Sequence, residues 1–179
     1  FHKGADLNIS DSIFELGKYY ENWKGCKPDY NKAVEYYKKS AKLENSRAIC
    51  QLGISYVEGK ILDSDYRKAF EYFQLAAGLG NSFGFYNLGL CYEKGFGVDV
   101  NLHKAALLYF KAAKLGNPFA FNNIGYCNEK GIGLDIDYEK AFEYYKFAAG
   151  LGCDAGFYNS GHCYEEGIGV MKNSVKAME

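Results

Sequence analysis

Proline is scarce in this sequence: the 179 residues include only two, beside 21 glycines. Few prolines and many glycines predict helices that are closed by glycine rather than a loop-rich β domain. Long apolar runs are also missing, because none approaches the roughly 18 to 20 residues that a membrane-spanning helix needs. We therefore expect no insertion into a membrane.

Positive charge is not in excess either. The formal net charge is -1 and the pI is near 6.4, so the chain has no basic field of the kind that neutralises phosphates. This balance argues against nucleic acid as a partner. Hydrophobic residues make up 48% of the chain and charged residues 24%, the ordinary balance of a globular protein that buries a core.

One short phrase recurs along the chain at a constant spacing. It reads NLGLCYEKGFGV at residues 87–98 and NIGYCNEKGIGL at residues 123–134. Its first glycine returns every 36 residues, and a Lys-Ala pair follows each of these glycines at the same distance. The five anchor glycines are Gly17, Gly53, Gly89, Gly125 and Gly161. A spacing that never shifts predicts a repeat array.

The array fills the chain. We predict one array over residues 1–179, in which 1–8 end a preceding repeat and 154–179 form a partial fifth repeat, with complete repeats at about 10–45, 46–81, 82–117 and 118–153. Both ends keep the phase of the repeat and fall within predicted helices. We therefore expect a segment of a longer solenoid, whose apolar end faces could associate end to end.

Each repeat reads as two helices. In the third repeat Phe85, Leu88, Gly89 and Tyr92 have the i, i+3, i+4, i+7 spacing of one helix face. Before the second helix of each repeat stands a short polar residue whose side chain can cap the first turn. These predicted caps are Asp29, Asp65, Asn101, Asp137 and Asn173.

The stretch Gly95-Phe96-Gly97 ends a first helix. Glycine reaches the left-handed conformation without steric penalty, so two glycines around one bulky residue predict a tight turn. A phosphate-binding loop would need a Lys-Ser/Thr pair after the glycines, and none follows. Trp23 and Ile61 replace turn glycines in the first two repeats, and we expect those turns to have a different shape.

The six cysteines do not form a disulfide framework in this reading. Cys91, Cys127 and Cys163 occupy one position in successive repeats, where helices pack about 8 to 10 Å apart, beyond the roughly 7 Å Cα limit of a disulfide. The same separation excludes a zinc ion shared with His162. We expect buried thiols and a reducing, cytoplasmic compartment, although the sequon Asn8-Ile9-Ser10 leaves a secretory lumen open.

No arrangement typical of an active site is present. No serine or cysteine has a histidine and an acid at any motif spacing, and only His162 of the three histidines falls on the first helix of a repeat. Glu93, Glu129 and Glu165 also stand on first helices and recur one repeat apart, so we interpret each as a solvated residue and not as half of an acid–base pair. We expect no catalytic residue, no metal and no cofactor.

The string L-G-x-x-Y-x-x-G-x-G-V-x-x-D/N-x-x-K-A-x-x-x-Y-x-x-A-A-x-x-G, found at Leu88 to Gly116, resembles the Sel-one-like repeat, a relative of the tetratricopeptide repeat. The resemblance covers essentially the whole chain. It implies an all-α fold, a right-handed superhelical solenoid of antiparallel helix pairs, whose first helices line a concave surface. It also implies a role as scaffold or adaptor. A bacterial branch of the family links cysteines about eight residues apart, and only Cys153 stands near such a place.

The tetratricopeptide geometry would place a polar column on the concave face, and an asparagine ladder can bind a peptide backbone through donor and acceptor together. The alternative is that these amides bridge neighbouring repeats. The predicted partner-binding residues are Gln51, Asn87, Asn123 and Asn159, the flanking Tyr86, Asn122 and Tyr158, the residues Leu90, Tyr126 and His162, and the acids Glu93, Glu129 and Glu165.

The function predicted from these features is a protein-interaction scaffold that binds a peptide segment or a partner surface along the concave face. Tyrosines would supply selectivity there, because they are enriched among binding hot spots. One alternative is a regulatory arm of a larger protein whose kinase or synthase domain lies outside this segment. Another is a hydrolase of small amides or glycans, which would need a deep polar pocket where the sequence predicts a shallow open groove.

Overall fold

The computed structural model describes residues 2–22, 28–59 and 62–177, with side chains from residue 9 onward. These residues form ten helices and no strand. Trp23 and Ile61, which replace turn glycines, and Cys26, one of the six cysteines, lie outside the described residues. The chain divides into two compact units, Phe1–Gly84 with Phe96–Val98, and Phe85–Gly95 with Asp99–Glu179.

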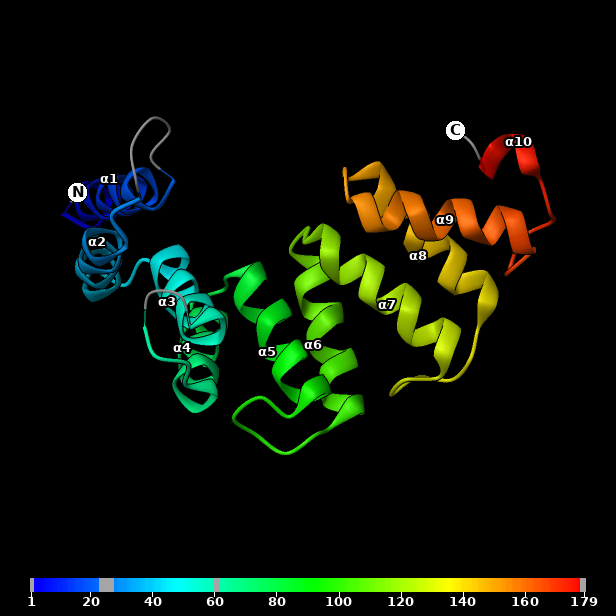
Figure 1. Cartoon of the computed structure of the whole chain (residues 1–179), viewed down its shortest axis with the longest axis horizontal. Coiled ribbons are helices and arrows are strands. Elements are labelled where there is room, and N and C mark those ends of the chain that lie inside the picture. The colour runs from blue at the N-terminus through cyan, green and yellow to red at the C-terminus, as the bar shows by residue number, and fades with distance from the viewer. Residues whose placement is uncertain (1, 23–27, 60–61, 178–179) are drawn as a thin grey trace. The chain divides into compact units, whose positions relative to one another are not determined.

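The helices follow one another in pairs, as Figure 1 shows. Unit 1 holds α1 (His2–Glu21), α2 (Tyr30–Lys42), α3 (Ser46–Glu58) and α4 (Tyr66–Gly78). The helix α5 (Ser82–Lys94) begins in unit 1 and continues in unit 2. Unit 2 continues with α6 (Leu102–Lys114), α7 (Pro118–Lys130), α8 (Tyr138–Gly150), α9 (Asp154–Glu166) and the short α10 (Ser174–Ala177).

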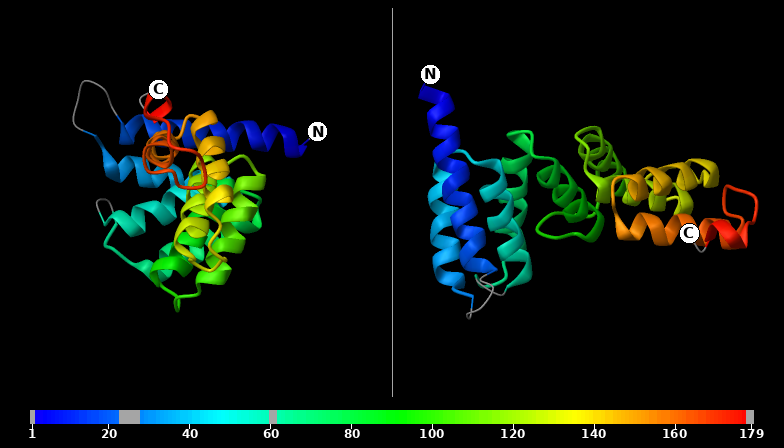
Figure 2. Two further views of the ribbon diagram at one scale, coloured as in Figure 1. Left: turned by 90° about the vertical axis from the view of Figure 1, so that its right-hand side faces the viewer. Right: turned by 90° about the horizontal axis from the view of Figure 1, so that it is seen from above.

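The two helices of a repeat run antiparallel. In the α7–α8 pair the backbone N–H of Asp137 donates to the carbonyl of Asn128 at 2.9 Å, next to the turn. Further from the turn on both helices, Gly125 of α7 lies against Tyr145 of α8. Figure 2 shows the same side-by-side packing of α1 with α2 and of α8 with α9. The predicted all-α fold of antiparallel helix pairs is confirmed.

An aromatic ring on each of the second helices α2, α4, α6 and α8 packs onto the anchor glycine of its partner helix. A Cβ added to Gly17 would lie 2.6 Å from the Tyr37 ring, and one added to Gly53 would lie 2.6 Å from Phe73. Tyr109 and Tyr145 take the same place against Gly89 and Gly125 in unit 2. The anchors are glycines because only the smallest residue leaves room for the ring.

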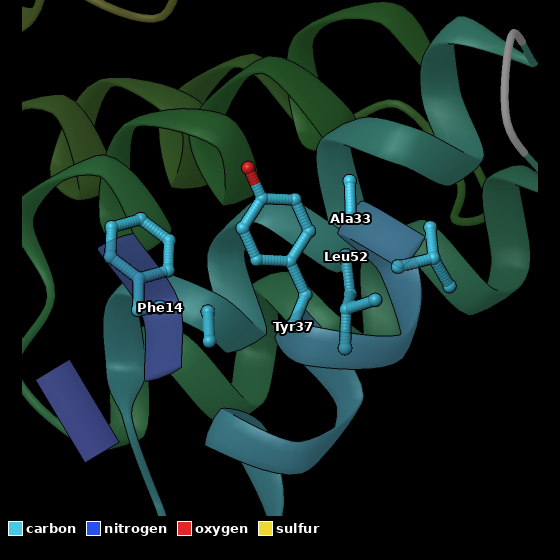
Figure 3. Close-up of a cluster of buried hydrophobic side chains, with 6 residues drawn as sticks. Phe14, Ala33, Tyr37 and Leu52 are labelled. Carbon is cyan, nitrogen blue, oxygen red and sulfur yellow. The ribbon is translucent and has the colours of Figure 1, made fainter. Parts of the chain in front are cut away.

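The core of unit 1 forms around the first of these rings. Tyr37 is fully buried beside Phe14, Ala33 and Leu52, and Figure 3 shows its hydroxyl pointing away from these apolar neighbours. In unit 2 the corresponding cluster contains Tyr145, Phe142, Ala141 and Cys163. The hydroxyl of each such tyrosine therefore needs a partner outside the apolar cluster.

The predicted caps are confirmed. The side chains of Asp29, Asp65, Asn101 and Asp137 each accept from the backbone N–H three residues later. Asn173 does the same for Lys176 at 3.1 Å. The turn glycines are confirmed as well, because Gly95 and Gly97 have φ of 76° and 73°, values that a side chain would strain.

The N-terminal helix differs from the prediction. We expected a helix of a preceding repeat to end by residue 8, but α1 continues without a break from His2 to Glu21. Other second helices end at a residue with positive φ, such as Gly80 at 78° or Gly116 at 79°. After α2 the corresponding residue is Glu44, with φ of 58°, so the position does not require glycine. Asn8 stands at the same position and lies inside α1.

Candidate binding surface

The predicted partner-binding residues of unit 2 come from the first helices α5, α7 and α9, and we call their common surface the first-helix face. Two rings stand out on it: Tyr126 of α7 is 44% exposed and Tyr158 of α9 is 75% exposed. Most of the other members are half-buried, and His162 and Glu165 are exposed. The face comprises Tyr86, Asn87, Leu90, Glu93, Asn122, Asn123, Tyr126, Glu129, Tyr158, Asn159, His162 and Glu165.

Several amides of the predicted polar column bond to the preceding repeat. In unit 1 the Gln51 Nε2 donates to the Glu21 carboxylate at 3.1 Å. In unit 2 the Asn159 Nδ2 donates to the Asn122 Oδ1 at 2.8 Å. These amides bridge neighbouring repeats, which is the alternative that the sequence left open. Partner binding by the same side chains stays a prediction, and it would have to compete with these bonds.

Asn123 has a similar position between repeats. It lies within hydrogen-bonding reach of the hydroxyls of Tyr86 and Tyr109. Burial raises the pKa of Tyr86, and the hydrogen bond from Asn123 acts in the opposite direction. The ring of Tyr86 also lies 5.9 Å from that of Phe119, centroid to centroid, so α5 and α7 are joined by aromatic and polar contacts together.

The recurring glutamates are not all solvated, and for two of them the interpretation from the sequence is wrong. The Tyr109 hydroxyl donates to Glu93 at 2.6 Å, and the Tyr145 hydroxyl donates to Glu129 at 2.8 Å. Both glutamate side chains are only 12% exposed. Each carboxylate accepts the hydrogen bond that the buried tyrosine of the second helix donates. Glu165, by contrast, is exposed.

Unit 1 contains the tyrosine–glutamate pair in its first repeat and lacks it in its second. Tyr37 donates to Glu21 at 2.6 Å, but in the repeat 46–81 the two positions hold Val57 and Phe73. The acid and the hydroxyl are thus replaced together by apolar groups. This joint replacement is a signal that the sequence contains, and comparing the repeats position by position would have found the pair.

The charge of Glu129 is held in place by its neighbours. Burial raises the pKa of this carboxyl, but hydrogen bonds from Lys130 and Tyr145 outweigh it and the net pKa is lowered. Burial and the nearby carboxylate raise the pKa of Tyr145 far above its ordinary value. At neutral pH the pair is therefore an ionised acid and a neutral phenol that donates to it.

Cys91, Cys127, Cys153 and Cys163 are buried and form no disulfide, as expected from their spacing. Burial raises the pKa of the Cys91 and Cys127 thiols to about 12 and that of Cys163 to about 11. A thiol with such a pKa holds almost no thiolate at neutral pH, and the thiolate is the nucleophile and the metal ligand. These residues fill space under the first-helix face.

A depression of about 670 Å³ lies on the second helix α8 of unit 2. Its lining includes Phe142, Phe147, Glu143, Lys146 and, from the following turn, Gly169. Phe147 is 60% exposed there. This depression is the main alternative to the first-helix face as a place for a partner.

No helix within the described ranges combines the length and the apolar character that a bilayer-spanning segment needs.

Paired helices, glycine turns and a constant repeat length define the class of helical repeat proteins. The Sel1 repeat matches residues 10–45, 46–81, 86–117, 119–153 and 158–179, and the chain belongs to this family. Sel1 repeat proteins are generally protein-interaction scaffolds and typically not catalytic. No curated protein sequence matches the chain.

Solved structures of the same fold support this assignment. A Sel1 repeat protein from Oxalobacter formigenes is 28% identical with a TM-score of 0.89, over 94% of this chain and 68% of its own. A protective antigen of uropathogenic Escherichia coli with an SLR fold is 31% identical with a TM-score of 0.79, over 97% of this chain and 37% of its own. The Helicobacter pylori cysteine rich protein B is 27% identical with a TM-score of 0.57, over 75% of this chain and 97% of its own.

Proposed function

We propose that this chain is a protein-interaction scaffold that binds a peptide segment of a partner along the first-helix face of unit 2. The observation that carries the proposal is the pair of exposed rings on adjacent first helices, Tyr126 at 44% and Tyr158 at 75% exposure. Tyrosine supplies rigid contact area that is apolar on its faces and polar at its tip, which is why it is common in binding hot spots.

The surroundings of the two rings suit a peptide. Leu90 of α5, at the repeat position of Tyr126, is half-buried, while Lys94 and Lys130 border the face as exposed cations. Because Glu93 and Glu129 are bonded to tyrosines inside the repeat, their carboxylates are fixed in position. A fixed acceptor can receive a backbone N–H of a peptide without a further loss of side-chain entropy. The amides serve mainly to hold the repeats together, and the rings make the contact.

The chain on its own is not an enzyme in this proposal. The high pKa values of the Cys91, Cys127 and Cys163 thiols support that view. Thiols with such pKa values stay protonated at neutral pH, and only the thiolate is a nucleophile. We also propose a reducing, cytoplasmic location. The buried thiols of Cys91, Cys127, Cys153 and Cys163, which form no disulfide, fit such a compartment.

A panning experiment tests the proposed function. A random-peptide library displayed on phage would be selected against the whole chain, and the affinity of each selected peptide measured against variants. We expect Tyr126→Ala and Tyr158→Ala each to weaken binding by about tenfold or more, as truncation of a hot-spot residue does. Leu107→Ala is the matched control, because Leu107 is 49% exposed on the second helix α6 of the same unit.

Two results would reject the proposal. One is a set of selected peptides whose affinity depends on Leu107 or Phe147 and not on the two tyrosines, which would move the binding surface to the second helices. The other is the absence of any selected peptide that binds the chain saturably. Circular dichroism of each variant separates loss of binding from loss of fold, and we expect no change, because both rings are exposed.

A further inference from the structure

The helix α9 departs from the two first helices before it at two positions of the exposed surface. Where α5 and α7 have Leu90 and Tyr126, α9 has His162. Where they have the lysines Lys94 and Lys130, α9 has Glu166. Between these positions Glu165 retains the glutamate of the repeat. The scaffold is conserved from repeat to repeat along this chain, so these changes are not needed to form the helix pair.

The changes bring three metal-ligating groups onto one turn. His162, Glu165 and Glu166 stand at i, i+3 and i+4 of a helix, and residues at those spacings are neighbours on its surface. One ligand atom of each lies within 4.8 Å of the other two. Ligands of a tetrahedral zinc ion at about 2.0 to 2.2 Å lie about 3.4 Å from one another. All three side chains are exposed, so small rotations are free to close the remaining gap.

The neighbouring groups favour a cation. In α5 and α7 a lysine pairs with the recurring glutamate, but α9 contains no lysine or arginine at all. The Lys172 Nζ is 3.9 Å from a Glu166 carboxylate oxygen and its side chain is 68% exposed, so it holds this carboxylate only loosely. The imidazole of His162 stacks on the Tyr158 ring, with 6.5 Å between centroids and 9° between planes. Glu129 of α7 interacts electrostatically with His162 and adds negative charge from the adjacent helix.

We propose that His162, Glu165 and Glu166 bind one divalent transition-metal ion, with Zn²⁺ as the reference ion. One nitrogen and two carboxylate oxygens form a ligand set that zinc accepts, whereas Mg²⁺ prefers oxygen alone and keeps most of its water. Three protein ligands leave a coordination position open for water or for a group of a partner. The site lies beside Tyr158, so a bound ion would change the charge of the first-helix face from negative toward neutral.

Isothermal titration calorimetry of the whole chain with ZnCl₂ tests the site. We expect saturable binding with a stoichiometry of one and much weaker binding of MgCl₂. His162→Ala and Glu165→Gln should each weaken Zn²⁺ binding by about tenfold or more, since even supporting residues of metal sites contribute that much. The matched controls are His103→Ala on α6 and Glu139→Gln on α8, both exposed in the same unit, and neither should change the affinity.

A second measurement identifies the ligand directly. In a ¹H–¹³C spectrum of the histidine rings, one equivalent of Zn²⁺ should shift the His162 resonances and leave those of His103 in place. Unsaturable binding, or binding that is unchanged in His162→Ala, overturns the proposal. So does a titration in which the resonances of His2 or His103 follow the ion instead. The peptide-panning result has no bearing on any of these outcomes, because the site does not depend on the proposed function.

Discussion

The repeats 46–81 and 118–153 have the same helix pair and differ in what lies between the helices. In both, a ring of the second helix packs on the anchor glycine, Phe73 on Gly53 and Tyr145 on Gly125. In the second repeat the hydroxyl of Tyr145 bonds to Glu129, whereas in the first the position of the glutamate holds Val57 and the ring has no hydroxyl. Either an apolar pair or a fully bonded polar pair can therefore stand between the two helices of a repeat, because neither leaves a buried polar group without a hydrogen bond.

The turns give the largest expected effect. Gly133 has φ of 67°, and a Cβ there would collide with the carbonyl oxygen of Leu102, so Gly133→Ala should lower the free energy of unfolding by about 2 to 4 kcal/mol. Gly150→Ala is the control, because nothing lies within 4 Å of a Cβ at that position, and it should be neutral or stabilise by up to about 1 kcal/mol. Urea denaturation measures both. Equal effects of the two variants would contradict the account of the turn.

Exchanging the pair is the next test. Tyr145→Phe removes the hydroxyl that donates to Glu129 and should cost about 1 to 3 kcal/mol. Phe73→Tyr should cost a similar amount, because the position that holds the acid in the other repeat holds Val57, which cannot accept from the new hydroxyl. The double variant Tyr145→Phe with Glu129→Val reproduces the apolar pair of the repeat 46–81 and should recover most of the loss, to within about 1 kcal/mol of the unchanged chain. Strictly additive losses in this double-mutant cycle would disprove the coupling.

Acid should distinguish the two repeats as well. The folded-state pKa of Glu129 is lowered, so its contribution to stability is fully present above the ordinary glutamate pKa of about 4.3. That contribution is lost as the pH falls from there through the folded pKa. The stability difference between the chain and Glu129→Gln should therefore shrink as the pH falls below about 4.3, as urea titrations at several pH values would show. Val57 does not titrate, so Val57→Ala should give a difference that is constant with pH.

The smallest effect is expected at a buried thiol. Cys127 corresponds to Ser55 in the repeat 46–81, and the Ser55 hydroxyl donates to the carbonyl of Gln51 at 2.9 Å. Cys127→Ser can place its hydroxyl against the carbonyl of Asn123 in the same way. We expect a cost below about 1 kcal/mol, whereas Cys127→Val, which has no donor and a branched Cβ, should cost more. Thermal unfolding of both variants shows which substitution lowers the stability more.

The sequence predicted those parts of the fold that depend on local chemistry. Asp137 caps its helix and Gly133 turns the chain because of their own side-chain oxygen or missing Cβ, so the residue type alone was sufficient. It did not predict that α1 passes residue 8 without a break, because no residue there either forbids or requires a turn. The bonds from Tyr145 to Glu129 and from Asn159 to Asn122 depend on how side chains meet across helices, which no single position reveals.

The surface remained the least predictable part for the same reason. Asn159 and Tyr158 are consecutive, yet one side chain bonds to the preceding repeat and the other is 75% exposed. Only the helix packing separates the amide that holds the array together from the ring that is free to meet a partner. A repeat pattern identifies equivalent positions but not which of them have contacts inside the array.

Hydrogen–deuterium exchange of the chain with and without a selected peptide is the most direct test of partner binding on the first-helix face. We predict slower exchange in α7 and α9 on binding, centred on Tyr126 and Tyr158, and unchanged exchange in α6 and α8. Protection confined to α8, around Phe142 and Phe147, would contradict the account and assign recognition to the second helices.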